Sequence, residues 1–482
     1  MPLVKTWQLI AVSAVAGLAL SVAAVAAAGP WDSGQRKAER DRAASWGLTG
    51  GADHDGDAGG GREPQAAPSA PGVLSAIGPA ALRKADAGAA PAGSGRLADV
   101  LRPLLADPAL GTVRTASVID TATGQVLFES GPREPMTPAS TIKIATAAAA
   151  LSALGPEHRI RTTVTPGAGP GEIVLVGGGD PSLTAKKKSP AGSGGSLVAL
   201  AADAAQALKA AGTAAVRLGY DDTLFTGPAR HPIGDNPNIA LITSLAADEG
   251  RPDDSTSGPV ERVEDPALET ARTFAALLRE RGVTVTGDPA RAKAPAGAQP
   301  LATTLSTPLG GLVERMLTNS DNDIAEVLAR QTALASGQPA SFEGAERAVT
   351  DRLTALGLDT AGARFADGSG LGRADKATTG LLAGLLAKAA DPQRPELRPV
   401  LTGLPVAGFT GTLRSRNVGT SPAAGLVRAK TGTLSGVNSL AGTVVDPSGR
   451  LLAFAFLTAN TPDPGAAEKG LDKLAAAVAR AS

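Results

Sequence analysis

The hydrophobic residues of the chain first become periodic near residue 96. Between residues 96 and 106 apolar residues recur every three or four positions, which predicts an amphipathic helix. Residues 115–120 and 125–129 predict two strands, joined by a hairpin turn with glycine late in the loop. The Ala- and Leu-rich stretch over residues 140–154 predicts a buried helix.

Between about residues 155 and 300 the pattern breaks into short stretches separated by glycine and proline. This change of character predicts an inserted domain, because long helical runs resume after it. The helices expected in it cover residues 197–211 and 266–281, and the strands cover residues 172–176, 215–218 and 283–286.

After residue 301 helices dominate, and the chain ends in a β-meander and a final helix. The expected helices cover residues 309–317, 324–335, 342–356, 378–388 and 464–482, and the expected strands cover residues 425–430, 436–445 and 451–457. Strands at both ends of the folded part, with helices between them, predict one antiparallel sheet built from both ends. We therefore expect an α+β fold, an antiparallel sheet plus a helical subdomain, with an inserted second domain.

The N-terminus predicts export. An uncharged apolar run over residues 9–28 follows Lys5 and ends in three alanines, as in a secretory signal peptide. The run is also long enough to cross a bilayer as an uncleaved anchor, so both interpretations stay open for residues 1–28. Residues 29–94 are rich in Gly, Ala and Pro and predict a flexible linker. We expect contact with a membrane only through the N-terminal segment.

The composition excludes several classes of chemistry. The chain carries 46 basic and 46 acidic side chains and only 2% aromatic residues, so nucleic acid is not an expected partner. It has no cysteine, which excludes disulfides and thiolate catalysis. The three histidines, His54, His158 and His231, have no metal-ligand spacing, and we expect surface or structural roles for them. Lysine is therefore the expected base for any nucleophilic chemistry.

Three short motifs follow one another along the chain: Ser140-Thr-Ile-Lys143, Ser320-Asp-Asn322 and Lys430-Thr-Gly432. Each motif alone is weak. Together and in this order, S-x-x-K, S-D-N and K-T-G are the signature of penicillin-binding proteins and class A β-lactamases. One motif precedes the inserted domain and two follow it. We therefore expect a catalytic domain in two parts, 95–155 and 301–482, around an inserted domain at 156–300.

The first motif supplies a nucleophile and a base. Ser140 and Lys143 lie one helical turn apart, so that the lysine amine comes near the serine hydroxyl. Burial among Ile142, Ile144 and alanines would lower the pKa of the amine, as a general base requires. The alternative is a helix-capping serine with a surface lysine.

The second and third motifs supply polar groups for a substrate. Ser320 would relay a proton and Asn322 would bind a substrate amide, although both could simply cap the following helix. Lys430, with the hydroxyls of Thr431 and Thr433, forms a compact group suited to a carboxylate. Glycine at position 432 would allow a substrate backbone to approach closely. The alternative for this motif is an edge strand protected by lysine.

The chain resembles the D-alanyl-D-alanine carboxypeptidase/endopeptidase family S13, of the penicillin-binding protein 4 type. The resemblance covers about residues 96–482 and includes the long segment between the first two motifs. Gly372 departs from the serine that is frequent there in the family. The supporting stretches are residues 138–143, 177–183, 367–371 and 411–414. We expect residues 177–183 and 367–371 to form turns.

The resemblance implies a serine β-lactamase/penicillin-binding-protein transpeptidase-like domain that acts outside the cytoplasm. Peptidoglycan stem peptides would be its substrates and β-lactams its inhibitors, with no metal and no cofactor. Backbone N–H groups of Ser140 and Thr433 would form the oxyanion hole. The implied catalytic residues are Ser140, Lys143 and Ser320, and the implied substrate-binding residues are Asn322, Lys430, Thr431, Gly432 and Thr433.

Two other functions remain open from the sequence. A β-lactamase-like esterase of class A would need a glutamate that activates water, in an E-x-x-L-N segment between the second and third motifs. No such segment lies between Asn322 and Lys430. A non-catalytic module that binds cell wall or senses β-lactams would not need an intact nucleophile, whereas all motif residues are intact here.

Overall fold

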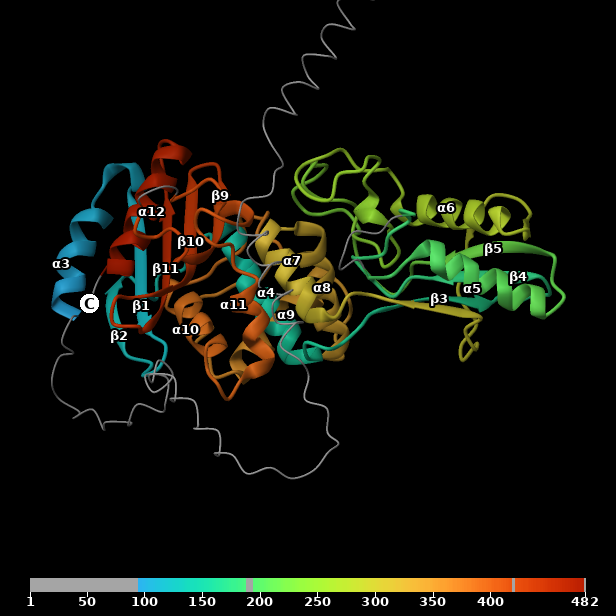
Figure 1. The fold of residues 1–482 in the computed structure, drawn as a ribbon, viewed down its shortest axis with the longest axis horizontal. Helices are drawn as coiled ribbons and strands as arrows, with labels where there is room; N and C mark the ends of the chain where they lie inside the picture. Colours follow the sequence, from blue (N-terminus) through green and yellow to red (C-terminus); the bar gives the residue numbers. More distant parts are fainter. Residues whose placement is uncertain (1–93, 188–193, 418–420, 481–482) are drawn as a thin grey trace, which may run out of the picture. The chain divides into compact units, whose positions relative to one another are not determined.

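Both ends of the folded part build one antiparallel sheet. The computed structural model describes residues 94–187, 194–417 and 421–480. The strand order is β2-β1-β11-β10-β9, and every neighbouring pair is antiparallel. The strands are β1 (Val113–Asp120), β2 (Val126–Ser130), β9 (Arg428–Leu434), β10 (Val437–Val445) and β11 (Leu451–Ala459). The sheet predicted from both ends of the chain is therefore confirmed, and so is the α+β fold (Figure 1).

The terminal helices cover one face of this sheet. Helix α3 (Ser94–Leu105) packs against β2 and against α12 (Pro464–Arg480), which in turn lies on β10 and β11. The apolar stripe of each helix points into a common core. Phe454 and Phe456 of β11 stack in that core with 5.2 Å between ring centroids.

The helical subdomain covers the other face. Its centre is α4 (Lys143–Leu154), whose first five alanines are fully buried and let α8 and α9 pack closely around it. Helix α10 lies between this group and strands β1 and β11. The further helices are α7 (Leu309–Asn319), α8 (Asn322–Ala335), α9 (Phe342–Ala355), α10 (Thr379–Ala389) and α11 (Arg398–Thr402).

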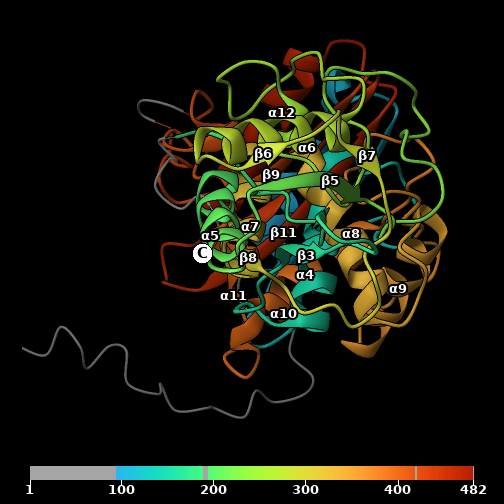
Figure 2. The same cartoon turned by 90° about the vertical axis from the view of Figure 1, so that its right-hand side faces the viewer.

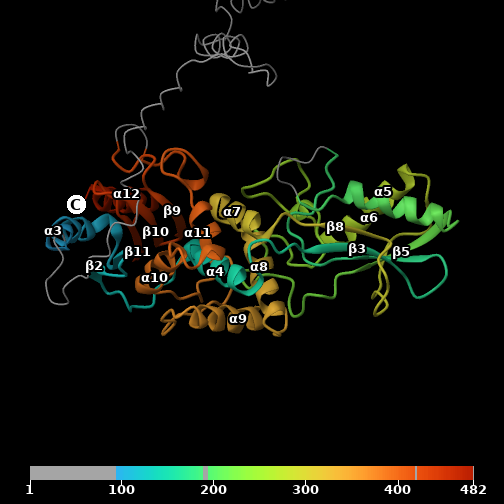
Figure 3. The ribbon, with the colours of Figure 1, turned by 60° about the horizontal axis from the view of Figure 1, so that its bottom comes forward.

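The second sheet is mixed and lies in what we call the insert, residues 156–305 (Figures 2 and 3). Its order is β6-β5-β4-β3-β8, with β7 beside β5. Helices α5 (Leu197–Ala210) and α6 (Pro266–Glu280) pack together over it around the buried Phe274. The strands are β3 (Arg161–Pro166), β4 (Glu172–Val176), β5 (Ala215–Asp221), β6 (Thr284–Val285), β7 (Ala290–Arg291) and β8 (Ala302–Leu305).

Several elements differ from those that the pattern predicts. The α-helix begins at Lys143 rather than at Ser140, which lies in a 3₁₀ turn, η2 (Ala139–Ile142). The turn packs against β9, and Ala139 takes a positive φ of 49° in it. The K-T-G motif lies inside β9 rather than at its end, because pairing with β10 continues to Leu434. Strands β3, β7 and β8 were not predicted, since they are short and rich in threonine or polar residues.

The segments predicted for residues 1–28 and 29–93 lie outside the described residues. Within the described part of the chain, no helix is both long and apolar enough to cross a membrane.

We expect Phe454→Ala to lower the free energy of unfolding by about 3–5 kcal/mol, because the ring is fully buried and the remaining cavity cannot close. Phe454→Leu should cost clearly less, since it keeps most of the apolar volume. Denaturant unfolding of the two variants beside the parent measures both values. Equal stability of the alanine variant and the parent would contradict this account of the core.

Candidate active site

The three motifs meet at one cleft. Ser140 comes from η2 and Thr433 from β9, whereas Ser320 follows the end of α7 and Asn322 begins α8. All four line a cavity of about 520 Å³. The insert contributes part of the wall through Ile233, Asn236, Asn238, Arg251, Ser257 and Gly258. Sequence positions almost 300 residues apart are thus brought to one place.

Lys143 is placed for contact with the Ser140 hydroxyl. Its side chain is fully buried, and Nζ donates to Ser140 Oγ at 3.0 Å. The same amine donates to Oδ1 of Asn322 at 2.7 Å and to the carbonyl oxygen of Ser369 at 2.5 Å. Three oxygens therefore fix the amine beside a half-buried serine. The predicted neighbourhood of Ser140 and Lys143 is present.

Burial lowers the pKa of Lys143 to about 8. Loss of water penalises the charged ammonium, and nearby carboxylates, first Asp367 and then Glu326, partly offset this loss. A fraction of the amine is therefore neutral near neutral pH. A neutral amine has the lone pair that a general base needs.

Ser320 and Asp321 of the S-D-N motif make different contacts. Ser320 ends α7 in the left-handed conformation, with φ 58°, and its Oγ accepts from Lys430 Nζ at 2.8 Å. Asp321 caps α8, because its side chain accepts from the N–H of Ile324 at 3.0 Å. The capping role that Ser320 or Asn322 could have filled therefore belongs to Asp321.

Lys430 lies under the cleft and is fully buried. Burial, together with the nearby charge of Lys143, holds the pKa of Lys430 well below its usual value. Its Nζ also donates to the carbonyl oxygen of Thr431 at 2.8 Å. The amine and the Ser320 hydroxyl thus form a second amine–hydroxyl pair beside the first one.

The threonines and glycine of β9 have contacts that the motif alone did not predict. The Thr431 hydroxyl pairs with that of Thr412 at 2.9 Å, and the Thr433 hydroxyl donates to Glu468 at 3.2 Å. A Cβ at Gly432 would overlap the Ser439 hydroxyl, and it would lie 2.8 Å from the carbonyl oxygen of Pro138 and 3.0 Å from the nitrogen of Ser140. The glycine thus allows η2 to rest on β9.

The insert contacts the motif turn directly. Asn322 Nδ2 donates to the carbonyl oxygen of Asn238 at 3.0 Å, which fixes the amide with its oxygen toward Lys143. One residue further on, Asp323 pairs with Arg262 at 2.9 Å. The orientation of Asn322 therefore depends on a backbone atom of the insert.

The segment at residues 367–371 does more than turn the chain. Its Ser369 carbonyl oxygen accepts from Lys143, and its N–H groups at Gly368 and Ser369 donate to Glu326 Oε1 at 3.0 Å each. The sequence predicted only a turn at residues 367–371 and assigned no role to Ser369, Asn238 or Glu326. The backbone contacts leave no mark in the side-chain pattern, and Glu326 has the spacing of an ordinary helical residue.

The antiparallel sheet, the helical subdomain and the three-motif cleft define the class of serine penicillin-recognising enzymes. Residues 97–252 and 248–478 match the D-Ala-D-Ala carboxypeptidase 3 (S13) family. Carboxypeptidase DacB of Mycolicibacterium smegmatis is 39% identical over 389 residues, which cover 79% of this chain and 83% of the relative. The D-alanyl-D-alanine carboxypeptidase of Actinomadura sp. is 31% identical over 452 residues, which cover 76% of this chain and 80% of the relative.

The fold agrees with these relatives. The crystal structure of penicillin binding protein 4 from Haemophilus influenzae matches with a TM-score of 0.60 at 22% identity, covering 79% of this chain and 98% of that one. The chain belongs to the S13 family and is a serine-type D-Ala-D-Ala carboxypeptidase.

We expect the acylation rate to decrease as the pH is lowered below about 8, because only the neutral Lys143 amine can accept a proton. The neutral fraction falls about tenfold for each unit of pH well below the pKa. Second-order acylation rates with a β-lactam between pH 6 and 10 measure this decrease, which is the acidic limb of the pH–rate profile. A rate that stays constant from pH 6 to 8 would contradict the role of the amine.

We expect Gly432→Ala to lower the acylation rate by about a hundredfold or more, because a small displacement of Ser140, the expected nucleophile, is enough for such a loss. The added methyl group would press on the turn that carries Ser140. Gly436→Ala is a control on the same strand connection, since space around that position is open, although its φ of 71° adds strain. A Gly432→Ala variant that is acylated at a rate near that of the parent would contradict this prediction.

Proposed function

We propose that Ser140 is the acylated nucleophile of this carboxypeptidase and that Lys143 is its general base. The supporting observation is the 3.0 Å contact between Lys143 Nζ and Ser140 Oγ, at a buried amine with a lowered pKa. In acylation the Ser140 proton passes to Nζ while Oγ forms a bond to the carbonyl carbon of the substrate. The Ser140 and Thr433 N–H groups receive the developing negative charge; one such donor contributes about 3–4 kcal/mol.

The second amine–hydroxyl pair carries the proton to the leaving group. As the peptide bond breaks, the departing nitrogen takes a proton from Ser320, and Lys430 replaces it through their 2.8 Å contact. The proton that Lys143 accepted from Ser140 then restores Lys430, so that one proton in total passes from Ser140 to the leaving group. The released group is D-alanine, or the peptide that carries the departing amine. Water then hydrolyses the ester on Ser140 and restores the serine.

The other polar groups of the second and third motifs would contact the substrate. Asn322 presents its amide at the cleft and orients the acyl donor. Lys430, Thr431 and Thr433 supply positive charge and hydroxyls for a terminal carboxylate. Gly432 lets η2 and the substrate strand lie close to β9. We infer that the substrates are peptidoglycan stem peptides ending in D-alanyl-D-alanine, and that β-lactams inhibit by acylating Ser140.

The place of action is proposed from sequence and relatives together. A mycobacterial relative is a carboxypeptidase of similar length, and stem peptides lie outside the cytoplasm. The apolar run at residues 9–28 would direct export, either as a cleaved signal or as an anchor. The catalytic domain in two parts, with an inserted domain between them, would then act in the cell wall space.

A β-lactamase-like esterase is less well supported. Such an enzyme needs a carboxylate that can activate water at the acylated serine. Two buried glutamates lie near the motifs. Glu249 pairs with two arginines, and the oxygens of Glu326 accept from Gly368, Ser369 and Arg330. Neither glutamate is among the residues that line the cleft. A non-catalytic module would have no need for two buried lysines that contact serine hydroxyls.

Intact mass spectrometry after incubation with benzylpenicillin tests the assignment. We expect the parent to gain the mass of one penicilloyl group, and Ser140→Ala to gain none. Ser415→Ala is a matched control, because this serine lies outside the cleft, and it should be labelled as the parent is. An unlabelled parent would refute the proposal, and so would a labelled Ser140→Ala variant.

A further inference from the structure

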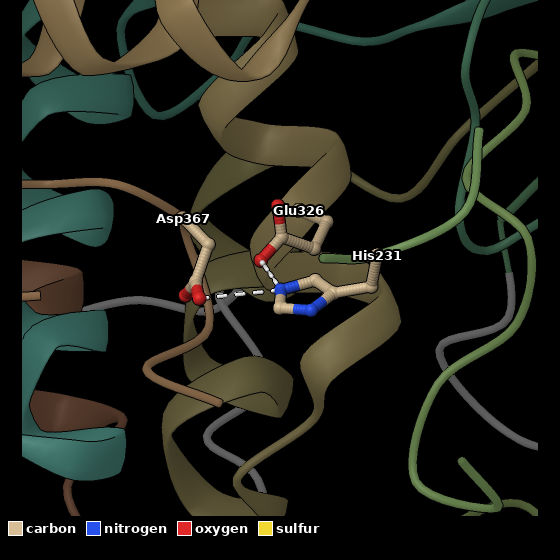
Figure 4. A group of neighbouring side chains, drawn as sticks. All are labelled: His231, Glu326 and Asp367. Carbon is tan, nitrogen blue, oxygen red and sulfur yellow. Dashed lines mark ion pairs between the residues drawn. The ribbon is translucent and has the colours of Figure 1, made fainter. Parts of the chain in front are cut away.

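His231 of the insert is buried against the catalytic part of the chain. It is 2% exposed, and its ring meets that of Phe342 edge-on at 5.5 Å between centroids. Nε2 lies 3.2 Å from Oδ2 of Asp367 and 3.6 Å from Oε1 of Glu326 (Figure 4). A loop of the insert thus reaches between α8 and the segment at residues 367–371.

The two carboxylates hold that segment in place. Asp367 Oδ1 accepts from the N–H groups of Ser369 at 3.0 Å and Gly370 at 2.6 Å. Glu326 Oε1 accepts from the N–H of Ser369 as well. The carbonyl of the same Ser369 accepts from the Lys143 amine. A continuous set of polar contacts therefore runs from His231 through two carboxylates and one peptide unit to Lys143.

The same carboxylates act on Lys143 through their charge, because Asp367 and Glu326 both raise the pKa of the amine against the effect of burial. A positive charge at His231 would oppose them. The charged or titratable groups around the histidine are Glu326 and Arg330 on α8, Glu343 on α9, and Asp367 and Asp375 before α10.

The charges of these groups partly cancel one another. Arg330 pairs with Glu326 at 3.1 Å, and burial beside Asp367 raises the pKa of Asp375 to about 9, which keeps that carboxyl neutral. The two remaining carboxylates raise the pKa of His231 to about 9 despite burial. The N–H of Ile233 lies 3.3 Å from Nδ1, a long contact that only a neutral ring accepts. In the neutral ring the proton is then on Nε2, which faces Asp367 at 3.2 Å and Glu326 at 3.6 Å but makes no hydrogen bond of regular geometry with either.

The three side chains are also close enough to one another to hold a metal ion. Their oxygens are already engaged, however. Glu326 Oε1 accepts two N–H groups, and Asp367 Oδ2 accepts the N–H of Gly372 at 2.7 Å. The ion-pair arrangement accounts for the contacts without a metal.

We propose that His231 is a positioning residue for acylation: through Asp367 and Glu326 it fixes the Ser369 carbonyl that holds the Lys143 amine beside Ser140. The inference rests on the proposed roles of Ser140 and Lys143. It assigns to the insert a direct influence on the base, in addition to its place in the wall of the cleft. The histidine touches neither substrate nor reacting atoms, and it acts only through the segment at residues 367–371.

Acylation of the full chain by a fluorescent penicillin, followed between pH 6 and 10, tests the proposal with three variants. His231→Leu removes both the N–H donor and the charge. His231→Gln keeps an N–H donor in a similar place without a charge. Phe342→Leu disturbs the packing of the same ring and removes the cation–π contact with Arg330 at 4.3 Å, but it keeps both carboxylates that face Nε2. Thermal unfolding of each variant gives the fraction folded, by which the rates are corrected.

We expect His231→Leu to lower the acylation rate at pH 10 about tenfold or more, because Lys143 is neutral there in every variant and only its position differs. His231→Gln should recover most of that rate. In both variants the acidic limb should move to higher pH, since uncompensated carboxylates stabilise the charged amine. Phe342→Leu should be less stable than the parent and keep the parental limb and rate.

Parental rates and limb in His231→Leu would overturn the proposal. Equal changes in His231→Leu and Phe342→Leu would also overturn it, since packing alone would then explain them. If the glutamine variant were as slow as the leucine variant at pH 10, the N–H donor would not account for the acylation rate. That result would overturn the positioning role. Failure of the proposed function itself would be distinct, because the parent would then not be acylated at all.

Discussion

The burial of the Lys143 amine is the constraint on which the rest of the site depends. A lysine in water is almost fully charged at neutral pH and cannot take a proton from serine. Removing it from water brings its pKa to about 8, and three oxygen acceptors keep the buried group in one position. These acceptors come from three separate segments of the chain. The fold must therefore bring η2, the S-D-N turn and the segment at residues 367–371 together before the amine can be a base.

The same constraint explains why α4 is so rich in alanine. Small side chains allow α8 and α9 to approach the helix closely and exclude water from the lysine at its first residue. They also allow the backbone of residues 367–371 to come within hydrogen-bond distance of that lysine. Larger residues on α4 would fill space, but they would separate the groups that hold the amine. Close helix packing is thus a condition of the chemistry.

Much of the catalytic cleft could be predicted from sequence, because its side chains lie in motifs with fixed local spacing. The one-turn separation of Ser140 and Lys143 is an example, even though Ser140 lies in a 3₁₀ turn. The contacts made by the carbonyl groups of Ser369 and Asn238 could not be predicted, since any residue can supply a carbonyl. His231 looked structural from sequence, and its partners lie about 95 and 136 residues away, at Glu326 and Asp367.

The neighbouring positions of β1 and β11 also affect how the molecule can fold. These strands pair along their whole length, although more than 330 residues separate them. A chain made from its N-terminus onward cannot complete the central sheet until nearly its last residues have appeared. The η2 turn, which carries the proposed nucleophile Ser140, rests on β9 and β10, so it lacks this support until those strands have been made. Such non-local pairing makes folding slow and leaves apolar strands exposed meanwhile, so full-length chains and truncated ones should differ sharply in solubility.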